Sequence, residues 1–530
     1  MGGTNSHRLL QQNHGVLARY MTSRPIAVFA ALALLVLLAY SNSFSAGFHF
    51  DDFAQITLNP YVSDVSNIPR FFVRTDLADT LSRQYRPVTT SSFALNHAVS
   101  ADSPWSYHAF NIGLHILNAF LLYLVITALF AAYGKSPSLI AFAAAALFAL
   151  HPVQTDAVTY VSGRAVLLAV FFWLSGFLCF LKFREDGGRS RTVYASTVPF
   201  CLLLGLLSKE TAVSLPAMMI LHDLLRPAGD SPNESSGRPK WPYHAAMVAL
   251  VGLFFVSKGR LQGFIATPDS PLRVADYLMT EAKVLLLYLR LLVLPINQNF
   301  DYYLPRTFAP DAGVAAGAAV VAASLVLAVR YARREPLAVF FGMWFLVTLA
   351  PESSLVPIID VAREYRLYLP SMGLAALAAM LIDRIFRGAA RYTARNAVFA
   401  CILSLFIVLT LSRNRVWSDD VSLWADTAGK APYSTRAHAS LGSALLRDGR
   451  YAEAAAELET ALRLKPMVVA VVNGRGVMFV QRSEVHADLG ECYQRLGRQA
   501  EAEEQFRRAA ALSVQTPDIP NPSPSLTSDM

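Results

Sequence analysis

Long apolar segments recur between residues 25 and 412, and they constrain this chain of 530 residues more than any other feature. A helical bilayer span needs ~20 apolar residues, and its backbone polar groups must bond within the segment. The pattern therefore predicts an all-α polytopic membrane bundle of about eleven transmembrane helices. The segments fall near 25–42, 108–132, 138–150, 165–182, 193–208, 211–225, 243–257, 312–331, 336–351, 367–386 and 396–412.

Composition supports the membrane class. Hydrophobic residues make up 54% of the chain and charged residues only 16%, whereas soluble domains carry about 25% charge. The net charge of +8 could indicate nucleic-acid binding, but Lys and Arg lie mostly in short loops between apolar segments. Membrane topology produces that distribution, so we expect no nucleic-acid partner. The four cysteines show no pairing or metal-binding spacing.

Basic clusters orient the spans. Those at 182–191, 226–240, 330–334 and 384–395 share the side of the N-terminus if the stretch 277–295 lies at the interface instead of crossing. We therefore expect residues 1–24 to be cytoplasmic and to precede an uncleaved signal anchor, with the membrane domain at 25–412. The non-cytoplasmic face then carries the first outer loop 43–107, the segments 151–164 and 257–311, the loop 352–366 and the C-terminal part.

Two adjacent carboxylates, Asp51 and Asp52, open the first outer loop about ten residues beyond the first span. A carboxylate at the membrane surface suits general-base chemistry on a substrate delivered from the lipid. The alternative is that the two acids cap a helix or begin a solvated loop.

Cations follow on the same predicted face at Arg164, Lys209, Arg363 and Arg366. Such groups can hold a phosphate, and arginine does so with a bidentate fork. Alternatively, Lys209 pairs with its neighbour Glu210, and the two later arginines only snorkel beside a span end. The supporting polar residues we expect near them are His151, Asp156, Glu210, Glu364 and Tyr368.

A polar stripe on the second span predicts helix packing more than ligand binding. Its members at helical spacing are His108, Asn111, His115 and Asn118. No HExxH motif, paired CxxC motif or EF-hand loop is present, so the sequence predicts neither a metal nor a required cofactor.

Several motifs in a fixed order resemble a known family. They are Phe50-Asp51-Asp52, Asn59-Pro60, Tyr85-Arg86-Pro87, His151-Pro152, Gly163-Arg164, Ser208-Lys209-Glu210, Asp301-Tyr302 and Leu367-Tyr368-Leu369-Pro370-Ser371. Together with a C-terminal repeat, the set is similar to the transmembrane and TPR-containing O-mannosyltransferases and their bacterial relatives. The chain departs from that pattern at Gln154-Thr155-Asp156 and at Glu364-Tyr365-Arg366, where an arginine is displaced by one position.

This resemblance implies a GT-C glycosyltransferase fold. It also implies a polyprenyl- or dolichyl-phosphate sugar as donor substrate and transfer outside the cytoplasm. In that fold an acid on the first outer loop is the usual catalytic residue, which corresponds here to Asp51 or Asp52.

From residue 413 to 514 the chain is charged and Ala-rich, and it predicts a TPR domain. Repeats are expected near 435–468 and 483–514, with a partial repeat near 415–434 and about fourteen inserted residues around 469–482. Arrays with so few repeats are only marginally stable by themselves. We therefore expect the repeats to lean on the membrane domain. Residues 515–530, rich in Pro and Ser, predict disorder.

The leading hypothesis is an inverting glycosyltransferase that moves a sugar, mannose by the resemblance, to Ser or Thr hydroxyls of exported protein. The acceptor would be held by the TPR domain, and the setting would be a bacterial inner membrane with a periplasmic TPR domain. In a eukaryote it would be the ER membrane with a luminal one. The alternatives are a non-catalytic membrane-anchored TPR scaffold for envelope assembly and a lipid-linked-sugar transporter.

Overall fold

The computed structural model describes most of the chain. The described residues are 25–74, 85–135, 138–185, 188–226, 240–262, 274–305, 307–353, 360–386, 391–464, 468–472, 475–478 and 482–514. The predicted cytoplasmic N-terminus 1–24 and the predicted disordered tail 515–530 lie outside them.

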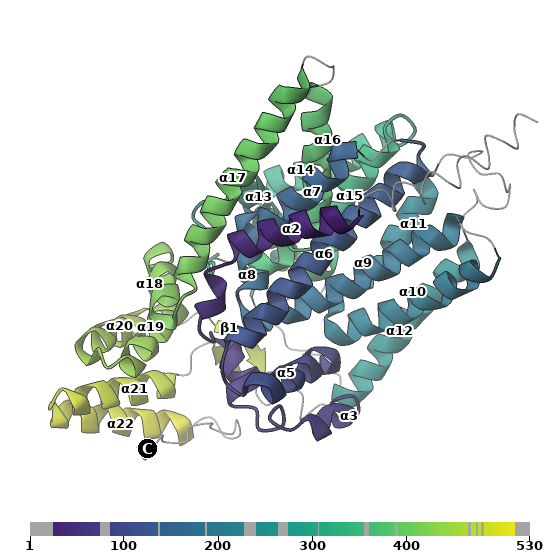
Figure 1. Cartoon of the computed structure of the whole chain (residues 1–530). Coiled ribbons are helices and arrows are strands. Elements are labelled where there is room, and N and C mark those ends of the chain that lie inside the picture. The colour runs from purple at the N-terminus through teal and green to yellow at the C-terminus, as the bar shows by residue number, and fades with distance from the viewer. Residues whose placement is uncertain are drawn as a thin grey trace, which may run out of the picture.

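The membrane domain is a helical bundle, and each of the predicted apolar segments contains an α-helix (Figure 1). The helices are α2 (Pro25–Ala39), α5 (Pro87–Ser100), α6 (Trp105–Ala132), α7 (Ser138–Leu150), α9 (Arg164–Glu185), α10 (Gly188–Ser208), α11 (Leu215–Leu225), α12 (Trp241–Gln262), α13 (Val274–Val293), α14 (Ala312–Tyr331), α15 (Pro336–Leu349), α16 (Pro370–Ile385) and α17 (Tyr392–Val416). The predicted all-α bundle is therefore confirmed.

Not all of these helices are full-length spans. Within the described ranges, five are long and apolar enough to cross a membrane, or six if α7 and the bent continuation Pro152–Val158 form one span. The five are Trp105–Ala132, Val161–Glu185, Arg189–Ser208, Ala312–Tyr331 and Tyr392–Val416. The remaining predicted segments form shorter or less apolar helices.

Burial separates inner helices from outer ones. The apolar window of α6 is 67% buried and that of the span containing α9 is 72% buried, whereas the windows of α14 and α17 are 6% and 11% buried. Outward-facing apolar residues such as Val326 and Val329 would be unfavourable in water, but they match lipid tails. The helices α6 and α9 thus form the core, and α14 and α17 present apolar faces to the bilayer.

The polar stripe on α6 packs between helices, as its spacing indicated. The His115 ring lies 2.7 Å from the Tyr368 hydroxyl and 2.9 Å from the Ala149 carbonyl, and the Asn118 amide donates to Leu167 O at 3.0 Å. Asn111 donates to three carbonyls of the segment 158–161. These contacts satisfy polar groups inside the bundle and join α6 to α7, α9 and the start of α16.

Short helical turns gather at one end of the bundle, where the chain leaves and re-enters the helices. They are η1 (Ser43–Ser45), η2 (Phe53–Thr57), η3 (Val65–Asn67), α3 (Ile68–Phe71), η4 (Pro152–Gln154), α8 (Thr155–Val158), η5 (Val161–Gly163), η6 (Glu210–Ser214), η7 (Ala350–Glu352) and η8 (Glu364–Leu367). Almost all of the residues expected to carry chemistry stand in or beside these turns.

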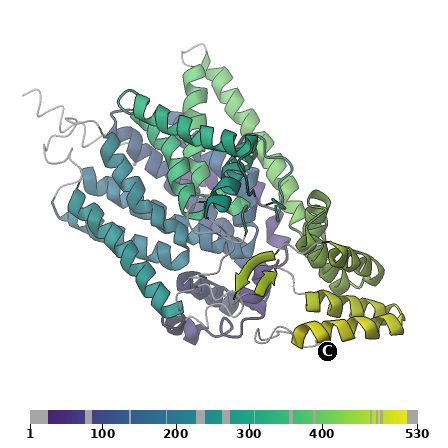
Figure 2. The same cartoon turned by 180° about the vertical axis from the view of Figure 1, so that it is seen from behind.

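The C-terminal helices form a separate lobe beyond the end of α17 (Figures 1 and 2). They are α18 (Asp420–Lys430), α19 (Thr435–Arg447), α20 (Tyr451–Arg463), α21 (Arg482–Arg495) and α22 (Gln499–Val514). The strands β1 (Val468–Val472) and β2 (Arg475–Met478) pair antiparallel within the insertion expected around 469–482.

The two helical pairs of this lobe repeat the same packing. A Cβ on Gly442 would lie 2.5 Å from Leu458, and a Cβ on Gly490 would lie 2.8 Å from Phe506, so each glycine lets two helices approach closely. Gly449 and Gly497 adopt φ of +78° and +75° in the equivalent turns, a conformation that glycine adopts readily. The predicted TPR repeats are confirmed by this geometry.

The lobe leans on the membrane domain, as expected for so few repeats. Arg436 of α19 forms ion pairs with Asp301 and, at 2.9 Å, with Asp360. The Lys430 ammonium donates to Gln298 O at 2.8 Å. Aromatic rings of both parts share one cluster, in which Phe300 lies 5.2 Å from both Trp417 and Trp424.

Candidate functional site

The first outer loop presents its two carboxylates differently. Phe50 has φ of +44°, an uncommon conformation for a bulky residue, and its ring packs 5.8 Å from both Phe300 and Trp424. After this turn the Asp51 side chain is exposed, whereas Asp52 is completely buried. The Asp51 backbone N–H donates to the Tyr160 hydroxyl at 3.1 Å, which ties the exposed acid to the segment between α8 and α9.

Asp52 is a structural acceptor. It accepts from the Ser162 backbone N–H at 2.7 Å, from the Ser162 hydroxyl at 2.5 Å and from the His49 backbone N–H at 3.0 Å. Burial raises the pKa of Asp52 to about 6, against the opposing effect of these hydrogen bonds. With its oxygens occupied, Asp52 holds the loop in place, and Asp51 is the one of the two acids that is exposed to solvent.

Arg363 also lies near Tyr160. Its guanidinium is 5.9 Å from the Tyr160 ring centre and 4.0 Å from that of Phe300, and it pairs with Asp156 at 3.8 Å. The pKa of Arg363 is raised despite burial, chiefly by Asp156. Arg363 is buried, so the alternative of snorkelling beside a span end is wrong.

Lys209 and Arg366 share one carboxylate, Glu352. The Lys209 ammonium lies 2.9 Å from Glu352, which also pairs with Arg366 at 3.5 Å and accepts from the Thr211 hydroxyl at 2.8 Å. Burial lowers the pKa of Lys209 to about 8. The ammonium also lies 4.2 Å from the ring centre of Tyr365, so Tyr365 stands between Lys209 and Arg363, whose guanidinium is 5.3 Å away.

Glu210 does not pair with its neighbour Lys209, so the alternative of a self-paired duo is wrong. Glu210 binds Arg86 at 3.2 Å and also Lys258 of α12. These two cations lower the pKa of Glu210 although burial opposes them. The carboxylates Glu210 and Glu352 are thus each held by two cations.

Arg164 is placed differently from the other predicted phosphate ligands. Its guanidinium is fully buried and donates to Asn111 Oδ1 at 2.9 Å, Ser92 O at 3.2 Å and Tyr107 O at 3.0 Å. The Phe93 and Phe110 ring centres lie 4.7 and 4.6 Å from it. Arg164 therefore joins α5, α6 and α9 below the first loop, and its donors are not presented to a substrate.

The predicted supporting residues also have defined partners. Asp156 accepts from the Tyr365 backbone N–H at 3.0 Å, and Glu364 accepts from the Tyr302 hydroxyl at 2.6 Å. His151 lies 3.1 Å from Leu292 O. Tyr368 lies deeper, bonded to His115 and Asn118, and it stabilises the bundle away from the cations.

Sequence reasoning missed Glu352, Arg86 and Lys258 as charged partners. Glu352 directly follows the apolar segment that ends near residue 351, the same signal that singled out Lys209. Glu281 of α13 was noted only as a charge in an interfacial helix, yet it is buried and burial raises its pKa to about 7, with Arg366 opposing. Among the described residues, no group of three or more His, Cys, Asp or Glu side chains could hold a metal ion.

These observations define a class: a multi-pass helical membrane protein with a TPR lobe, in which one end of the bundle carries an exposed carboxylate and a cluster of paired cations and carboxylates. The tetratricopeptide repeat family model matches residues 435–466 and 483–513. The chain is 27% identical over 512 residues to human protein O-mannosyl-transferase TMTC1, which covers 87% of this chain and 58% of that protein. It is 25% identical to the protein O-mannosyl-transferase F38B6.6 of Caenorhabditis elegans, over 84% of this chain and 64% of that one.

The similarity drawn from the ordered motifs is thus confirmed over most of this chain, which itself spans less than two thirds of the length of these relatives. Among solved structures, ArnT from Cupriavidus metallidurans bound to undecaprenyl phosphate aligns with 92% of this chain and 78% of its own. The TM-score is 0.40 and the identity 11%. That score is too low to establish a common fold.

Proposed function

We propose that this protein is an inverting glycosyltransferase that moves a hexose, mannose by analogy with its relatives, from a polyprenyl phosphate to Ser or Thr hydroxyls of an exported polypeptide. The names of the similar proteins support the transferase class. One observation carries the assignment of roles: the exposed Asp51 is tied through Tyr160 to Arg363, beside the cluster around Glu352.

In the proposed reaction the acceptor hydroxyl oxygen attacks the anomeric carbon and its proton passes to the Asp51 carboxylate. The bond between that carbon and the phosphate oxygen breaks, and its electron pair leaves with the lipid phosphate. Lys209, Arg363 and Arg366 would stabilise the charge on the departing phosphate. Fixed cations away from bulk water are effective in that role, because they need no reorganisation during the reaction.

Glu352 acts as a positioning residue in this scheme. It holds the Lys209 ammonium and the Arg366 guanidinium toward one point, and its pairing with Thr211 fixes its own orientation. Arg164 has no contact role with substrate here. It supports the first loop from beneath through α5, α6 and the start of α9.

Substitution of the two adjacent acids tests the proposal. Asp51→Asn removes the base, so turnover in a transfer assay with polyprenyl-phosphate hexoses and a Ser/Thr peptide should fall about 10²–10⁴-fold. The thermal unfolding midpoint should change less than in Asp52→Asn, because the Asp51 side chain is exposed and that of Asp52 is buried. Asp52→Asn should lower the unfolding midpoint and retain far more turnover per folded molecule.

Full turnover in Asp51→Asn would contradict the assignment of the base. A wild-type protein that transfers no sugar from any polyprenyl-phosphate hexose, and whose function depends only on its TPR lobe, would instead support the scaffold alternative. Movement of the lipid-linked sugar across vesicles without transfer would support the transporter.

A further inference from the structure

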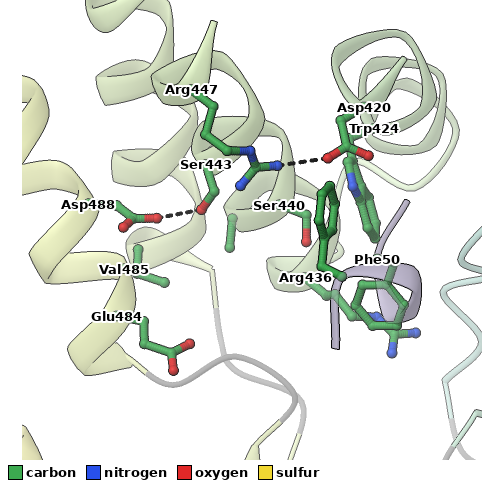
Figure 3. Close-up of a pocket in the computed structure, with 12 residues that line it drawn as sticks. Phe50, Asp420, Trp424, Arg436, Ser440, Ser443, Arg447, Glu484, Val485 and Asp488 are labelled. Carbon is green, nitrogen blue, oxygen red and sulfur yellow. Dashed lines mark hydrogen bonds and ion pairs between the residues drawn. The ribbon is translucent and has the colours of Figure 1, made fainter. Parts of the chain in front are cut away.

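A cavity of about 270 Å³ lies between the first outer loop and the TPR lobe. Phe50 and Phe53 of the loop line one side of it. Residues of α18, α19 and α21, among them Trp424, Arg447 and Glu484, line the rest (Figure 3). Both the loop and the lobe therefore contribute to the site. Asp51, the proposed base, lies between the two phenylalanines in the sequence.

Most charges around the cavity are compensated within the protein. Asp420 lies 2.8 Å from the His49 ring and accepts from Arg447 at 2.8 Å. Arg436 is held by Asp301 and Asp360. Arg447 also lies over the Phe53 ring, 5.6 Å from its centre, so this cation is fixed against the loop wall.

Two carboxylates on α21 are not ion-paired among the described residues, although the charge of Arg447 acts to lower the pKa of Asp488. Glu484 and Asp488 are one helical turn apart and both line the cavity (Figure 3). Asp488 accepts from the Ser443 hydroxyl at 2.5 Å, but neither acid forms an ion pair with any residue in the described part of the chain. Like charges at this spacing repel, and burial raises the pKa of both groups.

The walls and the charges together define a ligand. The aromatic side chains Phe50, Phe53 and Trp424 offer apolar surface, which favours the stem of a long cationic side chain. Glu484 and Asp488 at the far wall, which are not ion-paired with any described residue, then favour its positive end. TPR arrays present such concave surfaces to extended polypeptide, whose residues advance ~3.3 Å each.

We propose that this cavity binds a Lys or Arg side chain of the acceptor polypeptide, a few residues from the hydroxyl that receives the sugar. The inference rests on the proposed function, because it takes the ligand to be the acceptor chain. It adds a sequence preference that the catalytic cluster alone would not impose: a basic residue near the modified Ser or Thr. Phe50, which lines the cavity, directly precedes Asp51 in the chain.

Peptide binding to the full-length protein in detergent tests this, without any sugar donor. Three fluorescent Ser/Thr-rich peptides would differ at one central position, Lys, Gln or Glu, and binding would be followed by anisotropy. The Lys peptide should bind the wild type about tenfold more tightly than the Gln peptide, the effect of one charge-assisted contact. The Glu peptide should bind most weakly.

Charge reversal provides the decisive variant. The double substitution Glu484→Gln and Asp488→Asn should abolish the preference for Lys, and E484K with D488K should invert it toward the Glu peptide. The matched control is Glu503→Gln on α22, an exposed acid outside the cavity, which should leave the preference unchanged. Equal binding of the three peptides by the wild type, or a preference that survives the double substitution, would overturn the inference.

The proposed function and this inference fail separately. Asp51→Asn should abolish transfer yet keep the preference for the Lys peptide, because the base does not line the cavity. If the protein discriminates among the peptides but transfers no sugar, the proposed binding site is supported and the proposed transferase activity is contradicted. If it binds all three peptides equally and transfers sugar equally to them, the transferase activity is supported and the binding site is contradicted.

Discussion

Two buried charge clusters lie near opposite ends of the bundle, and they are built on different principles. At the outer end, Glu352 is shared by Lys209 and Arg366. At the other end, Asp223 of α11 pairs with Arg184 at 3.0 Å and contacts the His222 and His244 rings at 3.2 and 2.9 Å. Arg164 and Arg184 begin and end α9, so ~30 Å of helix separates the two ends.

The difference lies in how charge is balanced. Asp223 is contacted by one guanidinium, that of Arg184, and by two imidazoles. In the other cluster two cations, Lys209 and Arg366, converge on one carboxylate, and the neighbouring Glu210 repeats that ratio with Arg86 and Lys258. A carboxylate whose partners are one arginine and two histidines favours stability, whereas pairs of cations that converge on single carboxylates favour binding of an anion.

Substitution in the cluster around Asp223 should lower the stability of the protein. Asp223→Asn removes the buried carboxylate that pairs with Arg184 and contacts two imidazoles, which should cost about 3–5 kcal/mol of the free energy of unfolding. Transfer per folded molecule should not change. Thermal unfolding in detergent, together with a transfer assay normalised to folded protein, measures both quantities.

The control at the same end is Glu335→Gln. Glu335 forms an exposed ion pair with Arg384 at 2.9 Å, and such pairs contribute about 1 kcal/mol or less. A loss of transfer per folded molecule in the Asp223 variant would show that the cluster around Asp223 takes part in function and would break the comparison.

Substitution in the cluster around Glu352 should lower the rate of sugar transfer. Lys209→Met removes one cation from the proposed phosphate site while Arg366 and Thr211 still hold Glu352, so turnover should fall about 10²–10³-fold. Lys209→Arg keeps the charge and should retain most of that turnover. Single-turnover transfer on folded protein is the measurement, and wild-type turnover in Lys209→Met would remove this cluster from the mechanism.

The sequence predicted the position of this cluster better than its internal pairing. Basic loops and apolar segments determine which face each polar segment reaches, so the gathering of Lys209, Arg363 and Arg366 at one end could be predicted. Pairing depends on how α15 packs against the turn after α10, and no local pattern reports that. Glu352 was therefore missed, although it ends an apolar segment.

The same limit explains Arg164 and the two adjacent acids. Arg164 was predicted to bind phosphate, but its donors are taken by backbone carbonyls and by Asn111, which only the packing of α5 and α6 reveals. The sequence alone does not distinguish Asp51 from Asp52, because both are aspartates in adjacent positions. The turn at Phe50 exposes one and buries the other, because the aromatic cluster of the TPR lobe holds the Phe50 ring.

The smallest expected effect is a pH dependence of stability that distinguishes Asp52 from Asp51. Asp52 has a pKa of about 6 in the folded protein, against 3.8 for an unperturbed carboxyl. Between pH 4 and 6 the folded state therefore binds more protons than the unfolded state, so raising the pH through this window lowers the free energy of unfolding. The full change is roughly 2–3 kcal/mol for this one group.

Other carboxylates titrate in the same range, so the informative quantity is the difference between wild type and Asp52→Asn, measured by denaturant unfolding at pH 4, 5 and 6. That difference should change by most of this amount across the window, because the amide cannot titrate. Asp51→Asn is the matched comparison, because it makes the same change at the neighbouring acid, whose side chain is exposed. A parallel pH profile for wild type and Asp52→Asn would mean that the buried carboxyl does not hold its proton, and that the burial contrast at this turn does not separate the two acids.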